Sequence, residues 1–305
     1  MKKYKHRDLA GGHVQEFFML LPMFAGFCVF TIYPICWVLR WAWFDYAGYG
    51  KAIFIGAENF IRIFTRDGNY WRAITNTFYL AAAKLLIEMP LAITLAFFVN
   101  NRVKAASVFR IIYFLPAIFS IAVIGLIFTI LFSAYNGIVN AFLIWLGIIR
   151  ENINWFGGRW IALTVVLMVS LWSTFGLNMM YFLMGLQNIP LELYECATLD
   201  GASGSRQFFC ITIPLLAPVM QVVFMLSMLG TMRIADLVLV MTNGQPGGTT
   251  EVVMTYIFKY FFQYGDAGRI SQYGYGSALT VVTGIILAVM TIIYLKHSKR
   301  MKEIY

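Results

Sequence analysis

Two pairs of oppositely charged residues interrupt otherwise apolar stretches of the sequence. Lys84 and Glu88 are four positions apart, and Arg233 and Asp236 are three positions apart. On a helix these spacings bring two side chains onto one face, where opposite charges can pair. A charge inside a membrane is costly and usually faces a bundle interior or a cavity. We therefore expect Lys84 and Glu88 to neutralise each other, whereas Arg233, if Asp236 leaves it unpaired, has the chemistry to bind a carboxylate.

The side chains that most often hold metals or carry out hydrolysis are scarce. The three histidines lie in the terminal regions, at His6, His13 and His297. The cysteines have no metal-ligand spacing and stand at Cys28, Cys36, Cys196 and Cys210. The sequence also lacks the GxxxxGK[ST] loop that cradles phosphates. We therefore expect no metal, no cofactor and no ATP hydrolysis on this chain, and no catalytic site.

The elements that carry the charged pairs are predicted membrane spans. The chain has 305 residues, of which 60% are hydrophobic and 12% charged, and its mean hydropathy is +0.74. A soluble fold of this size cannot bury so much apolar surface. Runs of about 18 or more apolar residues predict transmembrane helices, and we expect six, near 17–39, 74–99, 108–132, 160–186, 212–241 and 275–295. The apolar stretch 138–149 is too short to span and is interpreted as an interfacial or re-entrant helix.

Lysine and arginine in the short loops predict the orientation. Residues 1–16, the loop after the second span and residues 296–305 are basic, and basic loops tend to stay in the cytoplasm. With six spans these regions fall on one side, so both termini are expected in the cytoplasm. The net charge of +9 is then a topology signal rather than a nucleic-acid footprint. The predicted domains are two cytoplasmic tails, 1–16 and 296–305, around a six-helix membrane domain at 17–295.

The loop between the fourth and fifth spans departs from this charge pattern, because it is acidic although it is expected in the cytoplasm. Asn188 and Pro190 predict the start of a helix, with Asn188 as the capping acceptor. Gly201 predicts its end, because glycine readily takes the left-handed conformation. A short helix with small residues and exposed carboxylates binds lipid headgroups poorly. We therefore expect it to dock a protein.

This loop resembles the EAA motif in the permease subunits of bacterial ATP-driven importers, the ABC importers. The motif reads EAA, three residues, Gly, nine residues, then I-x-L-P, and its positions are filled here by Glu195, Cys196, Ala197, Gly201 and Ile211 to Pro214. The departures are a cysteine for the second position and an isoleucine for the leucine. Further stretches resemble the carbohydrate branch, with permeases of the maltose and glycerol-3-phosphate type, at 58–64, 76–80, 109–120, 136–143, 185–202, 240–252 and 273–278.

The resemblance implies an all-α fold, the six-helix fold of type I ABC-importer permeases, in the bacterial inner membrane. The loop at 188–214 would contain the coupling helix, which docks into a separate cytoplasmic ATPase dimer that binds ATP and magnesium. The residues implied in coupling are Glu195, Cys196, Ala197, Asp200, Gly201 and Pro214. One chain would form half of the translocation path. A second homologous permease and an external solute-binding protein are therefore expected partners, besides membrane lipid.

The resemblance also implies a carbohydrate path within the membrane, lined by the spans that flank the coupling loop. Candidates by their offset from the motif are Ser170, Trp172, Ser173, Thr174, Asn178, Ser227, Thr231 and Arg233. Hydroxyl and amide groups match the hydrogen bonding of a sugar, Trp172 could stack on a sugar ring, and Arg233 would suit an acidic sugar. Each has a structural alternative, since Ser and Thr often bond back to helix carbonyls and Trp often lies at lipid interfaces.

A secondary, ion-coupled transporter of small polar solutes is the alternative function. Such a transporter is also a bundle of apolar helices, but it usually has more spans and has no need of a loop of the EAA type. A membrane enzyme would need embedded histidines or paired carboxylates, which the sequence does not show.

Overall fold

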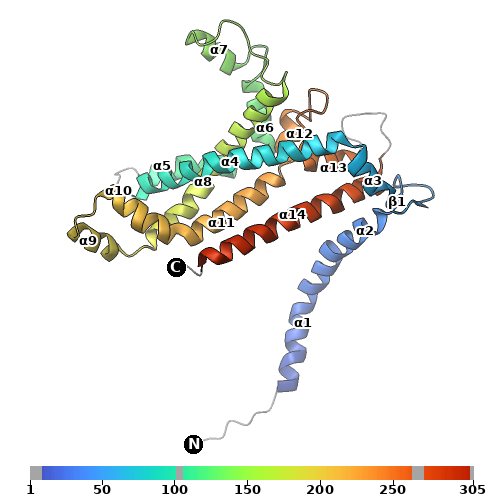
Figure 1. The fold of residues 1–305 in the computed structure, drawn as a ribbon, viewed down its shortest axis with the longest axis horizontal. Coiled ribbons are helices and arrows are strands. Elements are labelled where there is room, and N and C mark those ends of the chain that lie inside the picture. Colours follow the sequence, from blue (N-terminus) through green and yellow to red (C-terminus); the bar gives the residue numbers. More distant parts are fainter. Residues whose placement is uncertain (1–8, 101–105, 263–270, 303–305) are drawn as a thin grey trace, which may run out of the picture. The chain divides into compact units, whose positions relative to one another are not determined.

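The computed structural model describes residues 9–100, 106–262 and 271–302 (Figure 1). The chain divides into two compact units, one made of Met1–Arg66 with Tyr260–Ala288 and one made of Asp67–Lys259 with Val289–Tyr305. Most of the predicted basic loop after the second span, at 101–105, lies outside the described residues, as do positions 1–8 and 303–305 of the predicted tails. The described part of each tail is helical: α1 (Leu9–Phe27) begins before the first span, and α14 (Tyr273–Lys302) continues beyond the last.

Helices within the described ranges account for the predicted spans. Five are long and apolar enough to cross a membrane, over Glu16–Trp41, Gly68–Asn100, Arg159–Gln187, Gly204–Met232 and Tyr273–Ser298. A sixth span results if the bent pair Ser107–Ile118 and Ile121–Leu131 crosses as one. Helices are the expected spanning form, because a backbone in lipid must satisfy its own hydrogen bonds. The prediction of an all-α, multi-span membrane protein is confirmed.

The first unit contains the first span and the short elements that follow it. A π-helical turn at Cys28–Ile32 joins α1 to α2 (Tyr33–Trp41), where Pro34 lacks the N–H that a regular helix would use. Strands β1 (Phe44–Asp45) and β2 (Ile53–Phe54) then pair antiparallel, with Phe44 opposite Phe54. Helix α3 (Glu58–Thr65) and the first half of α14 complete the unit.

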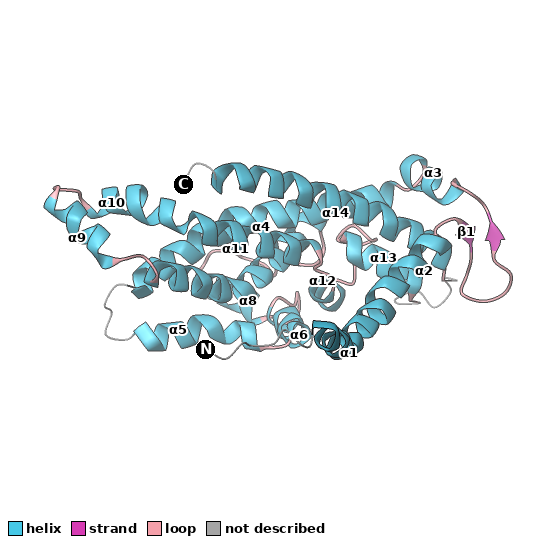
Figure 2. Ribbon diagram, turned by 90° about the horizontal axis from the view of Figure 1, so that it is seen from below, coloured by secondary structure: helices cyan, strands magenta, loops and turns pink. Residues whose placement is uncertain are grey.

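Three long helices form the core of the second unit. Helices α4 (Gly68–Asn100), α8 (Arg159–Gln187) and α11 (Ile213–Met232) pack on one another, and Figures 1 and 2 show them running side by side. Ala92 and Ala96 of α4 are fully buried in one cluster with Met179 and Phe182 of α8. Small side chains let membrane helices approach closely, so these alanines favour the tight α4–α8 packing.

The third predicted span is not the single straight helix expected over 108–132. Helix α5 (Ala106–Phe114) passes into a 3-10 turn at Leu115–Ile118, and α6 (Ile121–Leu131) leaves at 95°. Pro116 lies in this turn and cannot donate a backbone hydrogen bond. Gly176 of α8 accommodates the end of α5, because a Cβ at this position would lie 1.7 Å from the carbonyl oxygen of Tyr113.

The fifth predicted span, 212–241, has different boundaries at both ends. The helix continues upstream to Gly204 through a π-helical turn at Phe208–Thr212, in which the N–H of Ile213 bonds to the carbonyl of Phe208. Pro214 therefore lies within a continuous helix, because the wider turn accommodates its missing N–H. Downstream, α11 ends at Met232 and a separate short helix, α12 (Asp236–Met241), follows.

Short helices make the remaining connections: α7 (Ile138–Trp145), α9 (Leu191–Leu199), α10 (Gly204–Gln207) and α13 (Val253–Phe261). Helix α7 matches the short helix predicted at 138–149, and its Asn140 accepts a hydrogen bond from the indole of Trp155 at 2.9 Å. Helix α9 lies at one end of the second unit (Figure 2).

Candidate substrate cavity and coupling helix

A cavity of about 400 Å³ lies between α4, α8 and the junction of α11 with α12. Seven of the eight predicted path residues line it: Ser170, Ser173, Thr174, Asn178, Ser227, Thr231 and Arg233. The predicted stacking residue, Trp172, does not line this cavity. Its ring packs against Phe128 of α6, with 5.2 Å between the ring centroids. The structure thus brings the predicted polar residues together and separates the predicted aromatic one from them.

Some hydrogen-bonding groups of the cavity wall are already used, and others are not. The Ser173 hydroxyl donates to the Ser170 carbonyl at 2.9 Å, and the Thr231 hydroxyl donates to the Ser227 carbonyl at 2.8 Å. This is the back-bonding to the helix that was the structural alternative for these residues. The hydroxyl of Ser170 and the amide of Asn178 have no hydrogen-bond partner among the described residues, although their side chains are only 5% and 6% exposed. They retain bonding capacity toward the cavity.

Glu88 is fully buried and connects three helices. Its two carboxylate oxygens accept hydrogen bonds from Thr174 of α8 and from Ser227 of α11. Two hydrogen bonds from separate helices to one buried group favour this convergence of helices. Lys84 lines the cavity and interacts electrostatically with Glu88, although no direct ion pair joins the two in the described part of the chain.

Arg233 and Asp236 lie where α11 gives way to α12. Arg233 caps the end of α11 and Asp236 begins α12, so the continuous helix that would have paired them is interrupted. Each charge is favoured by the dipole of its own helix end. Both side chains are exposed and line the cavity, and no ion pair joins them within the described ranges. The N–H groups of the Arg233 guanidinium are available in the cavity.

Helix α9 begins at Leu191, and its start differs from the prediction. Pro190 occupies the cap position, where no side chain accepts a hydrogen bond. Asn188 instead caps the end of α8, with its N–H bonded to the carbonyl of Gly185 at 3.2 Å. The fixed backbone angle of Pro190 and the acidic Glu192 in the first turn favour the helix without a side-chain cap.

Gly201 ends α9 as the sequence predicts. Its φ is +77°, in the left-handed region. The Gly201 N–H bonds to the carbonyl of Thr198 at 3.0 Å, and the Ala202 N–H bonds to that of Ala197 at 2.9 Å, which are the two bonds of a Schellman motif. A Cβ on Gly201 would meet nothing within 4 Å. Glycine is therefore favoured here by backbone conformation and not by lack of space.

Side-chain hydrogen bonds hold α9 against the beginning of the next span. The hydroxyls of Tyr194 and Thr212 are 2.9 Å apart, and Thr212 is fully buried in the π-helical turn. The amide of Gln207 donates to the Thr198 hydroxyl at 2.9 Å and to the Ala202 carbonyl at 3.2 Å. Neither Gln207 nor Thr212 was predicted to have a role. The polar side chain of Thr212 within the apolar end of the motif is the sequence feature that could have indicated this contact.

The remaining surface of α9 is exposed and partly apolar. Leu191 is 65% exposed and Leu199 is 88% exposed. The exposed Glu195 lies with both in a shallow hollow of about 440 Å³ that Tyr194 and Thr198 complete. Of the other residues predicted for coupling on this helix, Ala197 is half-buried, and Cys196 and Asp200 are exposed. Exposed leucines around a carboxylate are typical of a surface that contacts another protein.

A comparison with known families decides the class of the protein. The model of the family described as "Binding-protein-dependent transport system inner membrane component" matches residues 88–303, which include Glu88, most of the cavity wall and α9. The chain belongs to this family. It is a transport permease and not an enzyme, and the ATPase of such an importer is a separate subunit. Within the described ranges, no group of three or more His, Cys, Asp or Glu residues is placed to hold a metal ion.

The permease is similar to permease proteins of other transport systems along nearly its whole length. It is 31% identical to the arabinooligosaccharides transport system permease protein AraP of Bacillus subtilis (strain 168), covering 92% of this chain and 87% of that protein. It is 29% identical to the trehalose/maltose transport system permease protein MalF of Thermococcus litoralis, covering 96% and 95%. A solved bacterial alginate ABC transporter in complex with alginate pentasaccharide-bound periplasmic protein matches with a TM-score of 0.81 at 23% identity, covering 96% and 98%. The predicted permease fold is confirmed.

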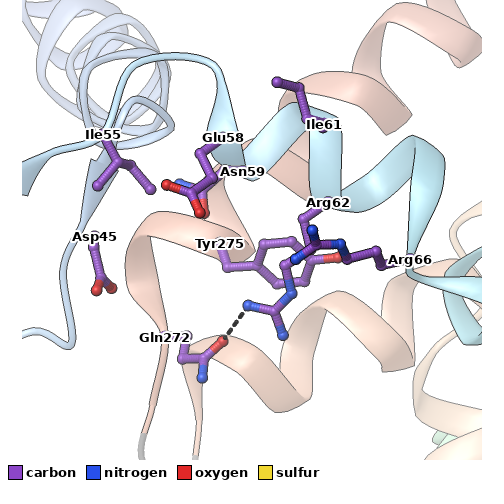
Figure 3. A pocket seen from close by; sticks show the side chains of 9 residues that line it. All are labelled: Asp45, Ile55, Glu58, Asn59, Ile61, Arg62, Arg66, Gln272 and Tyr275. Carbon is purple, nitrogen blue, oxygen red and sulfur yellow. Dashed lines mark hydrogen bonds between the residues drawn. The ribbon is translucent and has the colours of Figure 1, made fainter.

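The first unit of the permease contains a second cavity, of about 270 Å³ (Figure 3). Its wall is built by α3 and the start of α14. The buried Asn59 of α3 donates to the Phe44 carbonyl at 3.1 Å, which fixes the helix to β1. The Arg62 guanidinium lies 4.0 Å from the centre of the Tyr275 ring and donates to the Gln272 side chain at 3.2 Å. Stacking and the hydrogen bond together hold Arg62 in one orientation.

Charges of both signs surround this second cavity. Asp45 and Glu58 lie on one side of it, and Arg62 and Arg66 lie on the other (Figure 3). All four side chains are exposed. Arg62 is on α3 and Arg66 directly follows its end, four positions later, so the two can approach one acidic group together. No sequence motif predicted this cavity, because its parts come from positions far apart in the chain.

Proposed function

We propose that this permease imports a carbohydrate, either a sugar or an oligosaccharide, as one half of the membrane core of an ATP-driven importer. The observation that carries the proposal is the cavity between α4, α8 and α11. Polar side chains are costly in a bilayer, and a wall of them marks the path of a polar substrate. The volume of about 400 Å³ also falls within the usual ~300–1,000 Å³ of small-molecule sites. The names of relatives, which specify arabinooligosaccharides and trehalose/maltose, support a carbohydrate.

The residues proposed to contact the carbohydrate are those that line the cavity: Ser170, Ser173, Thr174, Asn178, Ser227, Thr231 and Arg233. Hydroxyl and amide groups both donate and accept, as do the hydroxyls of a sugar. We do not include Trp172, whose ring packs against Phe128.

Helix α9 is proposed to be the coupling helix, docked into a separate ATPase dimer that binds ATP and magnesium. Its hollow offers Glu195 for a basic group of the ATPase and two exposed leucines for an apolar contact. Closure of the ATPase would move α9, and the bond between Tyr194 and Thr212 would transmit the movement to α11. Since Ser227 and Thr231 are on α11, the cavity wall would move with it. Rigid movement of packed helices is a common switching mechanism.

The complete importer is proposed to contain a second, homologous permease, because six spans supply only half of a two-fold core. Both termini and α9 are proposed to face the cytoplasm of a bacterial cell, on the basis of the basic residues in the tails and loops. By the alternation of six spans, the segment between the first and second spans then faces outward. The second cavity, which Arg62 and Arg66 line, is in that segment.

A solute-binding protein is proposed to dock at this second cavity, through a carboxylate placed between Arg62 and Arg66. The predicted consequence concerns Arg66→Glu. Reversal of a charge at the rim of an interface mainly slows association, so about three to ten times more liganded binding protein should be needed for half-maximal ATPase stimulation. The matched control is Lys51→Glu, since Lys51 is exposed in the same segment but does not line the cavity. Equal shifts for both variants, or no shift for Arg66→Glu, would contradict docking here.

The proposed function is tested by assembling the importer in lipid nanodiscs from this permease, a second permease, the ATPase and the binding protein. We expect slow ATP hydrolysis that rises several-fold when sugar-loaded binding protein is added. Sugar-free binding protein is the control and should stimulate much less. If the assembled complex hydrolyses ATP at the same rate with and without the loaded binding protein, the proposal is contradicted.

A further inference from the structure

We propose that the membrane cavity accepts an acidic saccharide and that Arg233 binds a carboxylate of this substrate. The inference rests on the proposed function and specifies its substrate class. It would make Arg233 the residue that determines specificity between acidic and neutral sugars, while the serine, threonine and asparagine side chains bind the sugar hydroxyls.

Arg233 presents an unpaired guanidinium to the cavity. The two other arginines of this unit that bond to side chains are Arg159, which donates to Asn76 at 2.8 Å and 3.0 Å, and Arg72, which donates to Asn69 at 2.9 Å, among the described residues. The hydrogen bonds of Arg233 come from its backbone N–H and end at carbonyls of α11. In the part of the chain that the structure describes, its guanidinium has no hydrogen-bond or ion-pair partner. Because Arg233 lies in the wall of a polar cavity, these N–H groups are available to a ligand there.

The charges around Arg233 leave its guanidinium free for a ligand. Lys84 interacts electrostatically with Glu88, one helical turn away on α4. Arg233 and Asp236 both line the cavity, but no ion pair joins them within the described ranges. A carboxylate of the substrate would therefore meet an unpaired guanidinium. It would also match the planar guanidinium, whose N–H groups bind carboxylates in a bidentate manner.

Other groups of the cavity wall are free to bind the rest of a saccharide. The amide of Asn178 and the hydroxyl of Ser170 line the same cavity and have no hydrogen-bond partner among the described residues. Both groups can donate and accept hydrogen bonds, as the hydroxyls of a sugar can. Together with Arg233 they offer one cationic and two neutral binding points.

The experiment uses the assembled importer in proteoliposomes with ATP on the side of the ATPase. Two matched labelled probes are compared: a trigalacturonate, and the same trisaccharide after chemical reduction of its carboxyl groups to alcohols. Each is supplied at saturating concentration with binding protein. We expect ATP-dependent uptake of the acidic probe. Arg233→Gln should lower this uptake at least about tenfold, as expected for loss of a charge-assisted contact. Arg233→Lys should retain an intermediate rate.

Asp236→Asn is the matched control, since Asp236 lines the same cavity with the opposite charge. It should maintain or increase uptake of the acidic probe. ATP-dependent uptake of the neutral probe alone would overturn the inference and leave the proposed function standing. An equal loss of both probes in Arg233→Gln, or loss of the second permease from the purified complex, would assign Arg233 to structure or assembly and also overturn it. An assembled complex that transports neither probe would contradict both proposals.

Discussion

Replacing Gly201 by valine is expected to reduce ATP-driven uptake by at least about tenfold while the permease still inserts into the membrane. The φ of +77° is in the left-handed region, which costs an ordinary L-residue about 1–2 kcal/mol and a β-branched residue more. About 1.4 kcal/mol changes an equilibrium tenfold. Relief of this strain would break the bonds from Gly201 and Ala202 that end α9. The docking surface would then be misplaced relative to α11.

Two matched variants separate this explanation from a simple effect of size. Gly201→Asn adds a longer side chain but tolerates the left-handed conformation, so it should retain most of the uptake. Gly204→Val adds the same side chain three positions away, where φ is ordinary and a Cβ would also meet nothing within 4 Å. Its uptake should stay near that of the unmodified permease. If Gly201→Asn fails as badly as Gly201→Val, backbone conformation is not the reason for the glycine.

Replacing Glu195 by glutamine is expected to weaken the association of the permease with its ATPase by about ten- to a hundredfold. The side chain is exposed, lies in the α9 hollow, and has no hydrogen bond to another described residue, so its loss should not affect the fold. A hydrogen bond to a charged group contributes about 1.5–3 kcal/mol, which corresponds to that change in affinity. The affinity can be measured by titrating labelled ATPase onto the permeases in nanodiscs.

Glu192→Gln is the control for this prediction. Glu192 is an exposed glutamate on the same short helix, but it does not line the hollow. General electrostatic attraction to the ATPase would make the two variants equally weak. Equal losses of affinity in the two variants would therefore contradict a specific role for Glu195. An unchanged affinity in Glu195→Gln would show that Glu195 does not contact the ATPase.

Local sequence patterns predicted much of the fold, because lipid imposes simple rules on helices. The span over Arg159–Gln187 lies within one residue of its prediction at each end, and Gly201 ends α9 as expected. The bend at Pro116 was missed because the apolar run continues through it and hydropathy alone does not register a turn. The upstream extension of α11 was missed because the π-helical turn before Pro214 keeps the helix continuous.

Most residues of the candidate site were predicted from the sequence, but the contacts between them were not. The resemblance to the EAA motif, through the offset of each position from it, identified the polar positions on α8 and α11 that line the cavity. Spacing along α4 predicted that Glu88 would pair with Lys84, whereas its hydrogen bonds go to Thr174 and Ser227 on other helices. Such contacts depend on tertiary packing, which a single helix does not encode. The break after Met232 likewise separates Arg233 from Asp236, and only the fold reveals it.

We propose that this permease moves a carbohydrate by the use of ATP through a partner docked on α9. The decisive measurement is the uptake of labelled saccharide into proteoliposomes that contain the assembled importer and external binding protein. The driving force is either ATP on the side of the ATPase or an imposed proton or sodium gradient. We predict uptake with ATP, none with either gradient alone, and loss of the ATP-driven uptake in Gly201→Val. Uptake driven by an ion gradient without ATP would contradict the account and support a secondary transporter.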